Sequence, residues 1–211
     1  AFGPFALAHN GNLTNAEKLR NSLIATGSLF QPTTDTEAII HLVARSHQSA
    51  PKDRLAEALM QVSGAYALVA VVEGCLIGVR DPLGIRPLVM GTIGDATILA
   101  SETCALDIIG ADYVRDIDPG EMVVISKDGV SSVRLTEAQP SRFCIFEYIY
   151  FARPDSRLEG RSVYSARKSI GKELAAETGV EADLVVPVPD SGVPAAIGYA
   201  EASGIPFELG I

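Results

Sequence analysis

Residues 65–79 read AYALVAVVEGCLIGV, two apolar runs separated by the pair Glu73-Gly74. Both runs have the length of a strand and contain β-branched residues, and a pair that ends in glycine between two such runs is typical of a turn. Similar short runs follow at 88–91, 97–101 and 122–126. The pattern predicts a meander of antiparallel strands.

Helices are predicted ahead of this meander. Thr14 with Glu17, and Thr34 with Glu37, have the spacing of a capping box, and apolar residues at helical spacing follow each pair. A third helix is predicted over residues 52–62, because its apolar residues fall on one stripe. The first part of the chain is therefore expected to be α+β, with helices leading and strands following.

The pattern changes after Gln139-Pro140. A long helix is predicted over 162–178, followed by a strand at Leu184–Val188 and a second helix that begins near Ser191. The run 184–188 is continuously apolar, which is typical of a strand buried on both faces of a parallel sheet. The predicted domains are residues 1–142 and 143–211.

The composition is that of a globular, acidic protein. Hydrophobic residues make up 47%, and 17 Lys and Arg against 26 Asp and Glu give a formal net charge of −9. This charge opposes binding to nucleic acid or to an anionic membrane. Three cysteines without a CxxC pair argue against a disulfide framework or a self-contained zinc site, and favour the reducing cytoplasm. No apolar run approaches the roughly 20 residues of a membrane helix.

Both ends of the sequence look cut. The chain starts Ala1-Phe2-Gly3 without an initiator methionine and closes on the apolar run 205–211. A complete domain would seldom leave such a terminus. The second domain also holds only about one βα unit, which is too little to close a core around a parallel strand. We therefore expect a fragment that lacks both termini.

A few groups early in the chain can carry chemistry. Asn10 and Gly11 follow an apolar run and precede a predicted helix, so we place them in a strand-to-helix turn. The Asn carboxamide and the Gly N–H offer two donors at the spacing of an oxyanion hole, although an ordinary Asn-Gly turn is more common. Asp35 can accept a substrate ammonium group or cap a helix, and taken alone it favours capping. Asp81 and Arg86 are assigned to structure rather than to catalysis, because their charged side chains can pair across a hairpin and hold it together.

Several segments, in order along the chain, resemble class II glutamine amidotransferases, which are N-terminal-nucleophile hydrolases. The segments that carry this resemblance are 8–15, 34–37, 64–68, 80–88 and 99–106. Residues 144–156, CIFEYIYFARPDS, and 186–194, VPVPDSGVP, resemble the amidophosphoribosyltransferase family. The resemblance covers 3–211. It implies an α+β N-terminal-nucleophile hydrolase part with antiparallel sheets and helices, followed by the start of an α/β type I phosphoribosyltransferase domain.

The resemblance also implies a reaction. In the family, the thiolate of an N-terminal cysteine attacks the side-chain amide of glutamine. The ammonia released displaces pyrophosphate from 5-phosphoribosyl 1-pyrophosphate, which gives 5-phosphoribosylamine, the first committed intermediate of purine synthesis. Asn10 and Gly11 match the pair that holds the oxyanion. Asp35 matches the carboxylate that receives the α-ammonium group of glutamine.

Cofactors and partners are implied in the same way. Ser191 matches a Mg²⁺ contact at the pyrophosphate turn, although an Asp or Ser there can simply cap a helix. Cys144 matches the first ligand of a 4Fe–4S cluster that occurs in one branch of the family. The family is usually oligomeric and inhibited by purine nucleotides, so we expect a homo-oligomer for the full-length protein.

The sequence departs from the family pattern at its start. Ala1 is not the cysteine nucleophile, and we therefore predict that these 211 residues alone hydrolyse no glutamine. The alternative is a naturally short, non-catalytic homologue that acts as a binding or regulatory module. Sequencing outward from the coding region separates the two, because an upstream Cys-Gly supports the enzyme whereas start and stop codons support the short homologue.

Overall fold

A computed structural model describes residues 3–137 and 139–211. It divides into two compact units, named here unit 1 (Ala1–Ser101 with Val114–Phe143) and unit 2 (Glu102–Tyr113 with Cys144–Ile211). Within the described ranges, no helix combines the length and the apolar character needed to cross a membrane. Ala1, on which the prediction of a missing nucleophile rests, lies outside the described residues.

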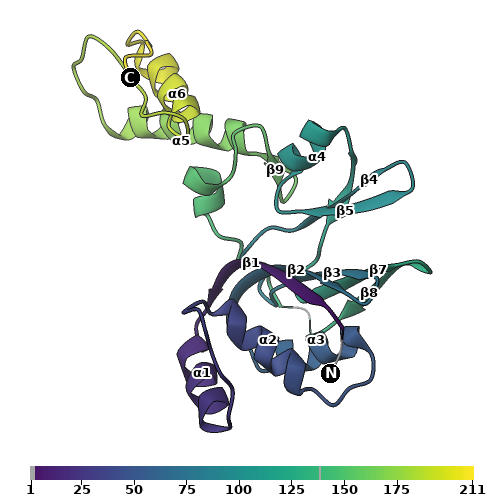
Figure 1. Cartoon of the computed structure of the whole chain (residues 1–211). Coiled ribbons are helices and arrows are strands. Elements are labelled where there is room, and N and C mark those ends of the chain that lie inside the picture. Colours follow the sequence, from purple (N-terminus) through teal and green to yellow (C-terminus); the bar gives the residue numbers. More distant parts are fainter. Residues whose placement is uncertain (1–2, 138) are drawn as a thin grey trace. The chain divides into compact units, whose positions relative to one another are not determined.

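The main sheet of unit 1 is antiparallel and contains the predicted hairpin. Its two strands pair from Ala67 with Arg80 to Val72 with Cys75, so the turn falls at Glu73-Gly74 as expected. The strand order is β1-β2-β3-β7-β8 (Figure 1). The strands are β1 (Phe5–Leu13), β2 (Gly64–Val72), β3 (Cys75–Arg80), β7 (Glu121–Ser126) and β8 (Gly129–Arg134).

The chain leaves this sheet after β3 and forms a second sheet of order β5-β4-β6. The predicted strands are therefore confirmed, but they belong to two sheets rather than to one meander. The cause lies in the loop after β3, where the buried Asp81 carboxylate accepts hydrogen bonds from the N–H groups of Leu83 and Ile85 and bends the chain. The strands are β4 (Val89–Ile93), β5 (Ala96–Ala100) and β6 (Asp112–Asp116).

The three predicted helices of unit 1 are confirmed, but the capping boxes predicted at Thr14 and Thr34 are wrong. The N-cap residues are Asn15 and Asp35, and neither side chain makes a capping hydrogen bond to its helix. The Asn15 amide instead donates to the carbonyl of Gln61 at 2.9 Å, so a tertiary contact replaces the local cap. The helices are α1 (Ala16–Ala25), α2 (Thr36–Arg45) and α3 (Pro51–Leu59).

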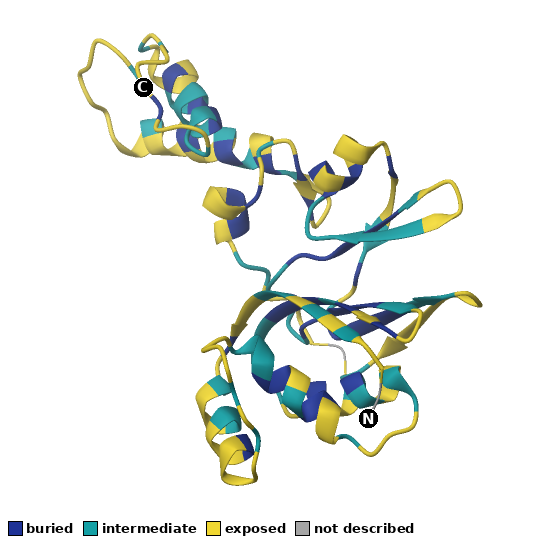
Figure 2. Ribbon diagram, in the orientation of Figure 1, coloured by how far each residue is buried: buried dark blue, intermediate teal, exposed yellow. Residues whose placement is uncertain are grey.

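Both faces of the main sheet are covered within unit 1. Alternate residues of a strand point to opposite faces. In β2, Leu68 and Ala70 pack in the cluster that the helices supply, while Ala67 packs with residues of the second sheet. Figure 2 shows the buried stretches of α2 and α3 along the sheet. The two clusters centre on Ile39, Val43, Leu55, Leu68 and Ile77, and on Leu88, Met90, Ile117 and Val123.

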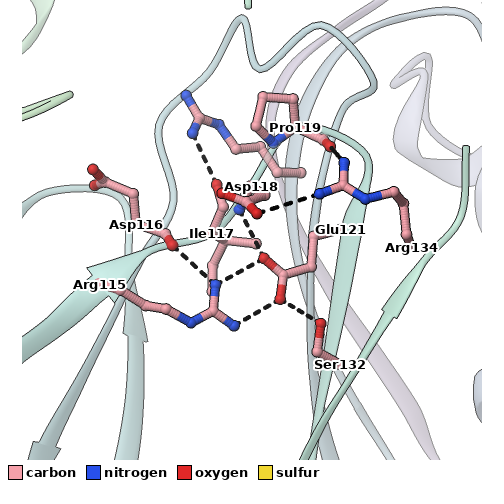
Figure 3. Close-up of polar contacts among 9 residues, drawn as sticks. Arg115, Asp116, Ile117, Asp118, Pro119, Glu121, Ser132 and Arg134 are labelled. Carbon is pink, nitrogen blue, oxygen red and sulfur yellow. Dashed lines mark hydrogen bonds and ion pairs between the residues drawn. The ribbon is translucent and has the colours of Figure 1, made fainter. Parts of the chain in front are cut away.

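A buried carboxylate fixes the start of β7. Glu121 accepts two hydrogen bonds from the Arg115 guanidinium, at 2.8 and 2.6 Å (Figure 3). It also accepts from the Ser132 hydroxyl at 2.5 Å and from the Asp118 N–H at 2.8 Å. Burial alone raises the pKa of Glu121, but these donors outweigh it and lower the pKa to about 2. The network ties β6 of the second sheet to β7 and β8 of the main sheet.

Unit 2 is mainly helical. An added Cβ at Gly171 would lie 1.9 Å from the Ala195 carbonyl oxygen, and one at Gly198 would lie 2.0 Å from that of Lys168. The two helices that carry these glycines therefore lie closer together than any residue other than glycine would allow. The longer one confirms the helix predicted over 162–178. The elements are α4 (Thr103–Ile109), a π-helix (Glu147–Phe151), β9 (Arg157–Leu158), β10 (Arg161–Ser162), α5 (Val163–Glu177) and α6 (Val193–Ser203).

The buried strand predicted at Leu184–Val188 is wrong for this structure. Val185 makes one isolated parallel bridge, with Phe207, and the described residues form no longer ladder there. Val186 and Val188 are 39% and 72% exposed. An extended segment is buried on both faces only when strands pair along both of its edges and other elements cover both faces, and within the described ranges only the segment at Phe207 pairs with this one.

Candidate functional site

Asn10 and Gly11 lie inside β1, not in a strand-to-helix turn as the sequence suggested. Asn10 pairs with Ala67 and Gly11 with Tyr66, and the register continues without a break to Leu13. The strand is longer than expected because β2 offers a partner to each of these residues. The ordinary Asn-Gly turn, the alternative interpretation of this pair, is therefore excluded.

Gly11 is required where it lies. Its φ is +145°, and an added Cβ would come within 2.1 Å of the Ala65 carbonyl oxygen. The backbones of β1 and β2 meet too closely at this position for any side chain. The position of the Gly11 N–H is therefore set by the strand pairing.

The Asn10 carboxamide has a defined orientation. Its Oδ1 accepts hydrogen bonds from the Arg86 Nε at 3.2 Å and from the Arg86 Nη2 at 2.7 Å. A guanidinium has donors and no acceptor, so the oxygen must face Arg86 and the amide nitrogen must point away. Within the described residues we find no hydrogen bond from the Asn10 Nδ2. This nitrogen can donate to a ligand.

The loop that carries Arg86 is rigid. Asp81 is fully buried, and its carboxylate accepts from the N–H groups of Tyr66, Leu83 and Ile85. Burial, the largest effect, raises the pKa of Asp81, and the backbone hydrogen bonds act against it. The structural role assigned to Asp81 from the sequence agrees with these contacts. The contact from Arg86 to Asn10 was not foreseen.

Asp35 is at the N-cap position of α2 without capping it. Its Oδ2 accepts from the Leu13 N–H at 2.8 Å. Its Oδ1 lies 3.6 Å from the Nδ1 of His9, a side chain only 2% exposed. The helix-capping alternative therefore does not account for Asp35. The carboxylate instead joins the end of β1 to the start of α2, and its side chain stays 22% exposed.

A pocket of about 480 Å³ opens beside Asp35. Asn12 lies on its wall, two residues along β1 from Asn10, which is not itself a lining residue. Arg20 also lines the pocket, with its guanidinium 4.4 Å from the centre of the Phe30 ring. The full lining is Asn12, Ala16, Glu17, Arg20, Phe30, Thr33, Thr34, Asp35 and Ala38.

The remaining candidates, Ser191 and Cys144, belong to unit 2. Ser191 lies in the turn before α6, whose N-cap is Gly192, and no side chain caps that helix. The capping alternative for Ser191 is therefore not supported. Cys144 is half-buried and forms no disulfide. Within 3–137 and 139–211, no three His, Cys, Asp or Glu side chains come together as a metal site.

Sequence reasoning missed three residues of this site. Arg86 holds Asn10, Asn12 lines the pocket, and His9 packs against Asp35. The only local signal was the density of Pro, Gly and charge around Arg86, which exceeds what a turn requires. The alternation of β1, once its length is known, places Asn12 beside Asn10.

Comparison with known proteins gives a consistent result. Residues 1–107, half of the chain, match the family described as glutamine amidotransferase domain. An amidophosphoribosyltransferase of Rhizobium etli is 53% identical over 99% of this chain and 43% of that protein. A chloroplastic amidophosphoribosyltransferase of Arabidopsis thaliana is 49% identical over 100% of this chain and 37% of that protein.

A solved structure also matches this chain. Glutamine phosphoribosylpyrophosphate amidotransferase from Bacillus subtilis, in complex with ADP and GMP, matches with a TM-score of 0.93 and 51% identity, over 98% of this chain and 45% of that chain. This chain thus spans less than half the length of the relatives it matches. By its fold, its motifs and the match over residues 1–107, the chain belongs to the family of glutamine amidotransferase domains.

Proposed function

We propose that this chain supplies part of an amidophosphoribosyltransferase that takes ammonia from glutamine and transfers it to 5-phosphoribosyl 1-pyrophosphate. The observation that carries the proposal is the fixed Asn10 carboxamide, whose oxygen is bound by Arg86 and whose nitrogen is left to donate. In this proposal the Asn10 Nδ2 and the Gly11 N–H bind the oxyanion, and Asp35 binds the α-ammonium group of glutamine.

The proposed glutaminase step uses a thiolate, glutamine and water, and it needs no cofactor. A cysteine thiolate attacks the Cδ of glutamine, and the carbonyl oxygen takes the negative charge. The C–N bond then breaks, a proton passes to the leaving nitrogen, and a thioester remains that water cleaves to glutamate. None of the cysteines among the described residues lines the Asp35 pocket, so in this proposal the thiolate comes from outside these residues. The oxyanion donors act only when charge develops on the oxygen.

Asp35 explains why the substrate would be an amino acid rather than a simple amide. Its carboxylate is partly exposed, lines the pocket and already has the Leu13 N–H as a fixed donor. A charge-assisted contact to an ammonium group contributes about 1.5–3 kcal/mol. The neighbouring Thr33 and Thr34 supply hydroxyl groups on the same wall.

The second step is proposed for unit 2. Ammonia attacks C1 of 5-phosphoribosyl 1-pyrophosphate and pyrophosphate leaves. Mg²⁺ is held mostly by water and substrate phosphates. The Ser191 hydroxyl, beside the exposed Asp190, therefore fits a site in which the substrate and water supply the other ligands of Mg²⁺. It does not by itself make a complete magnesium site. A 4Fe–4S cluster needs about four cysteines. Cys144 alone does not fit one.

Partners of the whole enzyme follow from the same proposal. Its substrates are glutamine and 5-phosphoribosyl 1-pyrophosphate, and the Bacillus subtilis relative was solved with ADP and GMP bound. We extend nucleotide binding, a homo-oligomeric assembly and a cytoplasmic location to the parent protein as parts of this proposal.

A chimera tests the proposal. The segment of the Rhizobium etli relative that matches this chain is replaced by this chain, and phosphoribosylamine formation is measured with glutamine and, separately, with ammonia. We expect both activities. Asp35→Asn keeps an acceptor for the Leu13 N–H but removes the charge, so KM for glutamine should rise roughly 10- to 100-fold. Asp53→Asn, an acidic residue in the first turn of α3, is the matched control and should change neither activity.

The two activities separate the outcomes. Ammonia-dependent activity without glutamine-dependent activity would contradict the glutaminase assignment. A chimera with neither activity would contradict the assignment of this chain to the enzyme, and would favour the short, non-catalytic homologue. An unchanged KM for glutamine in Asp35→Asn would contradict the role of Asp35 while leaving the rest of the proposal standing.

A further inference from the structure

We propose that Arg86 is a positioning residue that orients and polarises Asn10, so that the Asn10 Nδ2 faces the oxyanion. This inference rests on the proposed function, because it concerns how one of the proposed oxyanion donors is prepared. Arg86 lies 76 residues from Asn10 along the chain, and their side chains meet through two hydrogen bonds.

Arg86 fixes the orientation of the Asn10 amide. A free asparagine side chain can turn its amide by 180° and present either oxygen or nitrogen to a ligand. An oxygen facing the oxyanion would repel it. Since Arg86 donates from both Nε and Nη2 to the Asn10 Oδ1, only one orientation satisfies the guanidinium. The catalytically useful orientation is therefore built in before substrate binds.

The backbone of Arg86 is itself held rigidly. Arg80 is 2% exposed, and its guanidinium donates to the carbonyls of Arg86 at 2.8 Å, Gly84 at 2.9 Å and Ile117 at 2.8 Å. The Asp81 carboxylate holds the other side of the loop through backbone N–H groups. The Arg86 backbone is thus fixed by two buried charged residues. Such support is what holds a functional side chain in one geometry.

Arg86 also polarises the Asn10 amide. Hydrogen bonds in a chain strengthen one another when they are partly buried, and a charged donor has the largest effect. The contacts from Arg86 to Asn10 are partly buried. A guanidinium on the amide oxygen draws electron density from the amide nitrogen, so the N–H groups of Asn10 become better donors to a developing negative charge.

A purely structural role for Arg86 makes a different prediction. If the contact only fastened the loop to β1, its loss would lower stability and would harm every activity of the enzyme. The loss of rate caused by removing Arg86 would then be the same whether or not Asn10 is present. A positioning role predicts a loss confined to glutamine hydrolysis, and no further loss once Asn10 has been removed.

The experiment uses the chimera described above with Arg86→Met, Arg86→Lys, Asn10→Ala and the double variant Asn10→Ala/Arg86→Met. Removing an oxyanion donor lowers kcat by about 10²–10³-fold, and we expect roughly 10- to 100-fold for Arg86→Met because Asn10 is still present. KM for glutamine and the ammonia-dependent rate should not change. Arg86→Lys should recover part of the rate, because one donor is restored. Arg134→Met, at an exposed arginine, is the matched control.

The double variant decides between the two roles. We expect Asn10→Ala/Arg86→Met to be no slower with glutamine than Asn10→Ala alone. The inference is overturned if the two losses multiply, if Arg86→Met lowers the ammonia-dependent rate equally, or if Arg86→Met has no effect while Asn10→Ala is slow. If Asn10→Ala itself leaves the glutamine-dependent rate unchanged, the oxyanion assignment of the proposed function fails instead.

Discussion

Unit 1 and unit 2 hold their candidate residues in different ways. In unit 1, Gly11 is fixed by a nine-residue strand pairing and Asn10 by a guanidinium from a distant loop. In unit 2, Ser191 lies in a turn between one isolated bridge and the start of α6, and nearby Val188 is 72% exposed. The first site is set by contacts across the unit. The second is held, within the described residues, by one isolated bridge and by the packing of α6 against α5.

The largest effect that this comparison predicts is at Gly11. Gly11→Ala places a Cβ 2.1 Å from the Ala65 carbonyl oxygen at a φ of +145°, so β1 must separate from β2. We expect a loss of about 3 kcal/mol or more in the free energy of unfolding, measured by urea titration of the chain. Gly27→Ala, with positive φ but open space around it, should lose only about 1 kcal/mol. Equal losses would show that strand proximity does not fix Gly11.

In unit 2 the corresponding test is Gly198→Ala. The added Cβ would lie 2.0 Å from the Lys168 carbonyl oxygen, so α5 and α6 must move apart. We expect a loss of about 2–3 kcal/mol, seen as faster hydrogen exchange of amides in both helices. Gly179→Ala, where an added Cβ meets nothing within 4 Å, should leave exchange in α5 and α6 unchanged. Slow exchange in both variants would contradict the close packing of the two helices.

The pH dependence of unit 1 should come partly from Glu121. Its pKa is lowered from the usual 4.5 to about 2, so it stabilises the folded state above pH 4.5, and this contribution is lost as the pH falls toward 2. The Glu121 side chain is 6% exposed, so solvent screens its contacts little. We expect the stability difference between the natural chain and Glu121→Gln to shrink by about 2 kcal/mol between pH 7 and pH 3. Urea titrations at pH 7, 5 and 3 measure it, and a pH-independent difference would contradict the assignment.

The smallest effect is expected at Glu201 in unit 2. Its carboxylate lies 2.5 Å from the Lys168 Nζ and 3.2 Å from the Lys172 Nζ, but it is 45% exposed. Exposed ion pairs contribute little because water and salt screen them. Glu201→Gln should therefore leave the urea midpoint unchanged at 0.15 M salt. A shift as large as that of Glu121→Gln would remove the contrast between a buried and an exposed carboxylate.

The sequence predicted the secondary structure better than the contacts that hold the site. The strands over 65–79 and the helix over 162–178 were found because apolar periodicity is a local property. The capping boxes failed because the side chains of Asn15 and Asp35 bond to distant backbone groups and do not cap their helices. Local patterns do not report which tertiary partner competes for a polar side chain.

In the candidate site, too, the sequence indicated residues but not their tertiary partners. Asn10, Gly11 and Asp35 were predicted through a family resemblance and lie along β1 and at its junction with α2. The partner of Asn10, Arg86, was not predicted, since 76 residues separate the two and either could have found another partner. The strand at 184–188 was not formed because a parallel strand needs neighbours that periodicity alone does not supply.

One measurement tests the central claim most directly: a crystal structure of the chimera with an aldehyde analogue of glutamine bound covalently to its cysteine. The account predicts that the oxygen of the tetrahedral adduct lies about 2.7–3.1 Å from both the Asn10 Nδ2 and the Gly11 nitrogen, with the ligand ammonium group on Asp35. An adduct oxygen bound by other groups, or an Asn10 that turns its own oxygen toward the ligand, would contradict the account.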